Sequence, residues 1–176
     1  MDRDRARILG LFAIHLALLV VSLFVLSWFV ATAPAGTMSI DLRQARMCVS
    51  DGDCMAFSLG QIKSGMYGSL AFTALYGAIV FSLLVGFQAV ARLTSGVANV
   101  RLSKLGYLGG IGLFGNAFVA AYLFNPQVTG IQSELMGIDV ERTIAPILYF
   151  LAMFVGIAVL YFAANQTTDD VGEYKP

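Results

Sequence analysis

Four long apolar runs alternate with polar segments along the chain. They cover residues 8–30, 66–90, 105–124 and 144–164. Each run holds roughly the 20 apolar residues that a helix needs to cross about 30 Å of hydrocarbon. None has Asp, Glu, Lys or Arg in its interior. The pattern predicts an all-α membrane protein, built as a four-helix transmembrane bundle in one domain over residues 1–176.

The longest connection, residues 32–65, has a different pattern. Apolar and polar side chains alternate over residues 38–43 and again over 55–59, which is typical of half-buried strands. The segment from Cys48 to Cys54 lies between them and contains an Asp-Gly pair, a strong signal for a tight turn. We therefore expect a small β-hairpin in the first extracellular loop, with Cys48 and Cys54 joined as a disulfide that stiffens it.

Composition narrows the class of protein. The chain is 58% hydrophobic and 12% charged, against about 25% charged in a soluble domain. Four spans leave no room for a separate soluble catalytic domain. The formal net charge is zero, so no overall basic field attracts nucleic acid. We expect no enzyme activity and no nucleic-acid partner; the expected partners are membrane lipid and other membrane proteins or copies of this chain.

Basic residues indicate the orientation. Those at the N-terminus and between the second and third runs are Arg3, Arg5, Arg7, Arg92, Arg101 and Lys104. Inner loops rich in Lys and Arg are typical of multi-pass proteins. The charges therefore predict that both termini are cytoplasmic, in a plasma membrane or a bacterial inner membrane. The polar, acidic segment 165–176 is expected to be a short disordered tail.

Small residues recur at helical spacing in two of the runs. They are Ala74, Ala78, Ser82 and Gly86 in the second run and Gly106 and Gly110 in the third. Helices in lipid associate where small residues let their backbones approach closely. Two interpretations are open at this point: packing within one chain, or a surface for self-association.

Three polar side chains stand out inside the runs: His15, Gln88 and Asn116. An ionisable group at membrane depth is a functional candidate by default. The competing interpretation of His15 is a neutral imidazole bonded to Ser22, Asn116, Gln88 or a helix carbonyl. A single histidine cannot supply both axial ligands of a haem or complete a zinc site. We therefore predict no catalytic residue, no metal site and no cofactor.

The layout resembles claudins and the tetraspan proteins of the peripheral myelin protein type. The resemblance is carried by the four runs, by Trp28 at the outer end of the first, and by Cys48 and Cys54 in the first loop. It implies four helices, internal termini and a small outer sheet with a disulfide within the loop. The Gly-Leu-Trp motif that claudins place shortly before the first cysteine is absent from residues 41–48, so tight-junction function is not carried over.

These observations favour a non-enzymatic membrane protein that acts through lateral or extracellular protein contacts. It would be an accessory, adhesion or assembly subunit of a larger membrane structure. The expected contact surface is the charged part of the first loop, namely Arg43, Arg46, Asp51 and Asp53. The alternatives are a pore-forming channel subunit of a homo-oligomer and a small accessory subunit of a respiratory-type complex.

Overall fold

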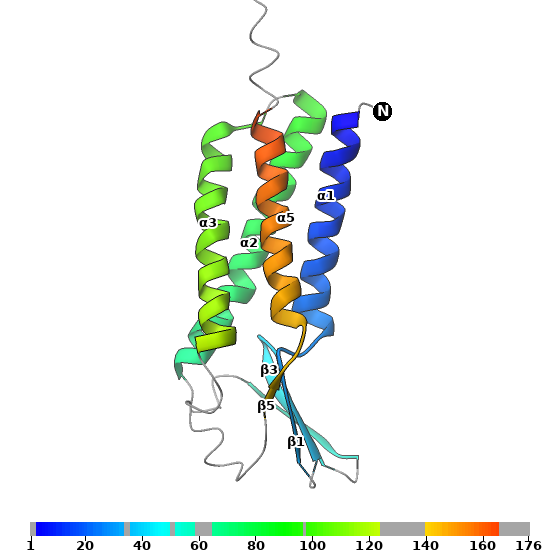
Figure 1. Cartoon of the computed structure of the whole chain (residues 1–176), viewed down its shortest axis with the longest axis vertical. Coiled ribbons are helices and arrows are strands. Elements are labelled where there is room, and N and C mark those ends of the chain that lie inside the picture. The colour runs from blue at the N-terminus through cyan, green and yellow to red at the C-terminus, as the bar shows by residue number, and fades with distance from the viewer. Residues whose placement is uncertain are drawn as a thin grey trace, which may run out of the picture.

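Four long helices stand side by side, and a small β-sheet lies beyond one end of them (Figure 1). The computed structural model describes residues 3–33, 36–49, 52–58, 65–96, 98–123 and 140–165. Its helices are α1 (Arg3–Val20), α2 (Gly65–Ser95), α3 (Val100–Phe118) and α5 (Ala145–Asn165), with π-helical turns η1 (Val21–Val25) and η2 (Val119–Leu123). Its strands are β1 (Phe29–Ala33), β2 (Gly36–Ile40), β3 (Gln44–Val49), β4 (Cys54–Ser58) and β5 (Val140–Arg142).

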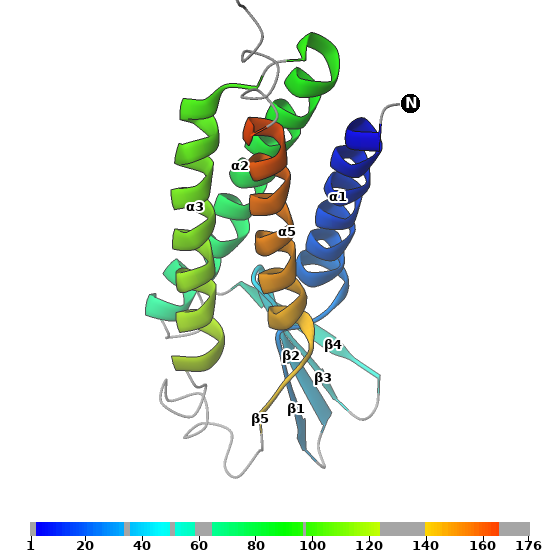
Figure 2. The same cartoon turned by 45° about the horizontal axis from the view of Figure 1, so that its top comes forward.

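The four predicted helices are confirmed. Within the described residues, four helical segments are long and apolar enough to cross a membrane: 4–25, 69–95, 100–122 and 145–164. α5 lies between the other three and packs against α1, α2 and α3 (Figures 1 and 2). The N-terminus and the α2–α3 connection lie at the end of the bundle away from the sheet.

Helix boundaries differ from the apolar runs. The first run was expected to be helical through residue 30, but its helical part ends at Val25, and β1 begins at Phe29. α2 continues to Ser95, where Gly96 takes a left-handed φ of +72° and ends the helix. α3 begins at Val100, five residues before the third run. Hydropathy alone does not show that a helix continues through polar residues. It also does not distinguish an apolar strand from the end of an apolar helix.

The two predicted strands belong to a larger sheet but are not neighbours in it, because the unpredicted strand β3 lies between β2 and β4. All strand pairs are antiparallel, in the order β4-β3-β2-β1-β5. The expected strand over residues 38–43 is interrupted, because the Asp41 carboxylate accepts hydrogen bonds from the backbone N–H groups of Arg43 at 2.6 Å and Gln44 at 2.8 Å. This turn reverses the chain between β2 and β3. β1 begins within the last residues of the first apolar run, and β5 lies about 110 residues further along the chain.

Trp28 joins the sheet to the helices. The sequence placed Trp28 at the outer end of the first apolar run, and the structure shows its side chain fully buried in the protein. Its ring N–H donates to the Ser22 carbonyl at 3.2 Å, and the ring meets Tyr149 edge-on at 5.5 Å. Its backbone N–H donates to Ile40, and its carbonyl accepts from Thr143. Trp28 therefore connects η1, which follows α1, to α5, to β2 and to the residue after β5.

Candidate functional site

The face of the sheet that carries Ala45 changes from buried to exposed toward its outer strands. Ala45 in β3 is fully buried, whereas Met47 is 41% exposed and Val49 is 45% exposed. Met55 of β4 pairs directly with Met47 and is 65% exposed. Cross-strand partners share one face of a sheet. Met47, Val49 and Met55 thus form an exposed apolar surface at the edge of the sheet, which we call the methionine face.

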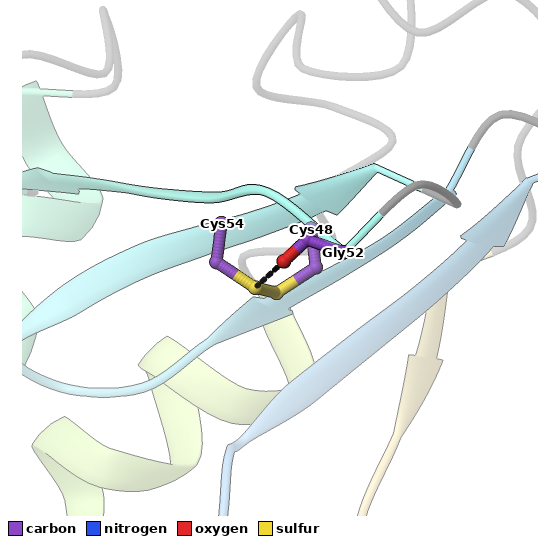
Figure 3. The surroundings of a disulfide bond; sticks show 3 residues. All are labelled: Cys48, Gly52 and Cys54. Carbon is purple, nitrogen blue, oxygen red and sulfur yellow. Dashed lines mark hydrogen bonds between the residues drawn. A yellow bond between two sulfur atoms is a disulfide. The ribbon is translucent and has the colours of Figure 1, made fainter.

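The Cys48–Cys54 disulfide joins β3 to β4 on the opposite face of the sheet from Met47 and Met55 (Figure 3). The two cysteines are register partners, and the predicted pairing is confirmed. Gly52, with a φ of +97°, closes the turn and donates its N–H to the Val49 carbonyl at 3.0 Å. The Gly52 oxygen lies 4.0 Å from the Cys54 sulfur. A disulfide sulfur carries no proton, so that dashed line marks a contact rather than a hydrogen bond.

A closed ring of this size stabilises the hairpin by about 2–3 kcal/mol in the loop-entropy account. β4 is an edge strand of the described sheet, with β3 as its only strand partner there. Exposed edge strands readily pair with other chains unless something restrains them. The disulfide therefore fixes the register of the edge strand and presents the methionine face in one arrangement.

The charged residues expected to form the contact surface are dispersed. Arg43 pairs with Asp41 at 3.2 Å and lies 5.4 Å from the Phe24 ring centroid, so it faces the end of α1. Arg46 is exposed on the face of the sheet opposite Met47. Asp53 is exposed in the turn, and Asp51 lies outside the described residues.

His15 lies at the centre of the helical bundle and is fully buried. Its Nδ1 lies 2.7 Å from the Ala152 carbonyl oxygen, and its Nε2 lies 2.9 Å from the Ser82 hydroxyl. A carbonyl can only accept, so Nδ1 carries a proton. In the neutral imidazole, Nε2 then accepts from Ser82. His15 thus uses both nitrogens to connect α1 to α5 and α2, and it has a helix carbonyl as one partner but none of the side chains expected.

Gly156 makes the room that this imidazole occupies. A Cβ at position 156 would lie 2.6 Å from a ring carbon of Phe81 and 2.9 Å from Cε1 of His15. Real Cβ atoms do not approach other atoms that closely. The histidine, Phe81 and Gly156 therefore form one packed unit, which sequence reasoning did not connect.

The other polar side chains of the runs also bond to backbone groups of this chain. Asn116 donates to the Leu70 carbonyl at 2.8 Å and holds α3 to α2. Gln88 donates to the Asn99 carbonyl at 2.9 Å and accepts from the Asn99 N–H at 3.0 Å. Asn99 in turn caps α3 with its own side chain. These amides fix the two ends of the α2–α3 pair.

The predicted packing residues face other helices of the same chain. They are Ala74, Ala78, Ser82, Gly86, Gly106 and Gly110. A Cβ at Gly106 would lie 2.5 Å from Leu160 of α5, and one at Gly86 would lie 3.0 Å from Phe12 of α1. At these positions the small residues allow close packing inside one bundle.

Sequence reasoning missed the methionine face. Met55 was assigned to a half-buried strand, and Met47 and Val49 were not assigned to any strand, although both belong to β3. Only the extent of the sheet shows which of its apolar positions are left uncovered.

Comparison with known proteins gives no family. No protein family model matches this chain, and no curated protein matches it. The site therefore has to be interpreted from its own chemistry.

Proposed function

We propose that this chain is a multi-pass membrane protein that works by binding another protein through the methionine face of its extracellular sheet. Both termini are cytoplasmic in this proposal, and the protein is an accessory, adhesion or assembly subunit rather than an enzyme. The observation that carries it is the exposure of Met47, Val49 and Met55 beyond the apolar helices.

The apolar methionine face, beyond the ends of the helices, favours a protein as the binding partner. Exposed leucine and phenylalanine on the helices are accounted for by lipid. The sheet lies past the helix ends (Figure 1), and in the proposed membrane placement lipid tails would not cover it. Methionine is flexible and polarisable, and it is frequent at surfaces that bind proteins. A disulfide that restrains the adjoining edge strand lowers the entropic cost of binding there.

The contacts of the polar residues in the helices weigh against the two alternatives. A homo-oligomeric pore needs polar side chains that face its axis, but Ser82, Gln88 and Asn116 bond to groups within this chain. A haem-bearing subunit needs an available imidazole nitrogen. Both nitrogens of His15 are engaged, which disfavours ligation of a metal.

The orientation is testable with the disulfide itself. The chain has two cysteines, and they are bonded to each other. We expect that intact cells treated with a membrane-impermeant reductant and an impermeant maleimide will give protein carrying two labels. Omitting the reductant should abolish labelling. If labels attach only after the membrane is broken, the sheet is on the cytoplasmic side and the proposed orientation is wrong.

The proposed contact surface is tested by Met47→Lys. A charge in the centre of an apolar interface must be desolvated, and we expect at least a tenfold loss of partner binding, equivalent to about 1.4 kcal/mol or more. The free energy of unfolding should change by no more than about 0.5 kcal/mol, because Met47 lies on the surface. The measurement is photo-crosslinking in native membranes with p-benzoylphenylalanine placed at Met55, followed by mass determination of the adducts.

Thr37→Lys is the matched control. Thr37 is exposed on the opposite face of the same sheet, beside Cys48. The Thr37→Lys substitution adds the same charge without altering the methionine face, so the protein adduct from position 55 should persist. Absence of any protein adduct from position 55, or equal loss in both lysine variants, would show that the methionine face is not the contact surface.

A further inference from the structure

An open groove of about 660 Å³ runs between α2 and α3 on the outside of the bundle. Its α2 wall extends from Phe72 to Leu84, about 18 Å of helix at 1.5 Å per residue. Gly109 and Gly112 line the α3 wall, and a Cβ at either would meet nothing within 4 Å. The missing side chains of these two glycines leave the groove open along its length.

A cation lies at one end of this groove. Arg101 stands one helical turn before Leu105, which lines the groove, so both occupy the same side of α3. Helical side chains lean toward the N-terminus of their helix, which directs Arg101 beyond the end of the groove. Lys104 lies at the same end of α3 but points about 100° around the helix from Leu105, away from the other lining residues of α3. Both cations are exposed, and neither has an ion-pair partner among the described residues.

We propose that the α2–α3 groove binds an anionic phospholipid of the cytoplasmic leaflet. One acyl chain lies against Gly109 and Gly112, and the phosphate pairs with Arg101. An apolar groove that ends at an exposed cation matches the two parts of such a lipid. This inference shares membrane placement with the proposed function but does not depend on the methionine face.

A second helix is a poorer fit than an acyl chain. A helix with its side chains is about 10 Å across, too wide to enter between two helices that are already in contact. The floor of the groove is also closed, because α2 and α3 touch where a Cβ at Gly77 would lie 2.3 Å from Leu113. The furrow therefore suits a thin, flexible chain. The positive charge at the end of the groove favours an acyl chain that belongs to an anionic lipid.

The test uses the full chain in vesicles that contain trace phosphatidylglycerol or phosphatidylcholine with the same photoactivatable acyl chain. We expect phosphatidylglycerol to label peptides from both walls of the groove more strongly than phosphatidylcholine. Gly112→Leu fills the groove and should remove this labelling. Arg101→Gln should lower the phosphatidylglycerol-to-phosphatidylcholine ratio about fivefold, the factor expected for one cation near anionic lipid.

Two variants serve as matched controls. Gly115→Leu adds the same side chain to α3 at another open position that does not line the groove, and labelling should persist. Arg5→Gln removes an exposed cation from α1, away from the groove, and should leave the ratio unchanged. Circular dichroism of each variant verifies that the helices are intact.

Two outcomes would overturn the lipid site. They are equal labelling by the two lipids and equal labelling of Gly112→Leu and Gly115→Leu. If Phe154, exposed on α5, is still labelled by either lipid, membrane placement stands and only the specific site fails. If no helix is labelled at all, membrane placement fails as well, and with it part of the proposed function.

Discussion

Trp28→Ala should lower the free energy of unfolding by about 3–5 kcal/mol, the range for removing a buried aromatic side chain. The indole is fully buried where α1, α5 and the sheet meet, so its loss leaves a cavity that three elements border. Unfolding by sodium dodecyl sulfate in mixed micelles, followed by circular dichroism, measures the change. We expect the methionine face to be disturbed too, because the sheet is attached through this junction.

Two comparisons make this result specific. Trp28→Phe keeps an aromatic ring but loses the N–H donated to the Ser22 carbonyl, and it should cost about 1–3 kcal/mol. Phe87→Ala removes an aromatic side chain that is exposed on α2 and should cost less than either change at Trp28. If Trp28→Ala is no more harmful than Phe87→Ala, the junction at Trp28 does not hold the sheet to the bundle.

Gly156→Ala should destabilise the bundle by about 2–4 kcal/mol. Overpacking a core costs about 1–3 kcal/mol, and displacing His15 from the Ala152 carbonyl adds about 1 kcal/mol for the lost hydrogen bond. The added methyl would collide with Phe81 and His15, whose rings are held by their surroundings. The fluorescence of Trp28, the single tryptophan, reports unfolding in the same micelle titration.

Gly115→Ala is the control for this substitution. A Cβ at position 115 meets nothing within 4 Å, and alanine is the better helix former, so stability should be unchanged or slightly higher. The double variant His15→Ala with Gly156→Ala should lose less than the sum of the two single changes, since removal of the imidazole frees the space. Strict additivity would show that the two residues do not share one packed site.

If the groove between α2 and α3 holds lipid and the methionine face holds a protein, the two surfaces act on opposite sides of the membrane. The helices between them contribute packing and buried hydrogen bonds. His15, Gln88 and Asn116 then serve to hold helices together, and substitutions there should alter function only by altering stability.

The sequence by itself determined the four helices and the disulfide. High hydropathy over about 20 consecutive residues predicts a membrane-spanning helix. Two cysteines on either side of an Asp-Gly turn also lie within one short segment. These features can therefore be predicted without knowledge of the tertiary contacts. The same local view placed Trp28 in an apolar helix, because an apolar strand and the end of an apolar helix have the same composition.

Only the tertiary structure decided where each polar and apolar side chain points. Pairing of β1 with β5 joins segments about 110 residues apart, and no periodicity records such a contact. The partners of His15 depend on how three helices pack, and Gly156 gives no sign of its role until Phe81 is beside it. Exposure of Met47 and Met55 likewise follows from where the sheet ends, a property of the whole fold rather than of any segment.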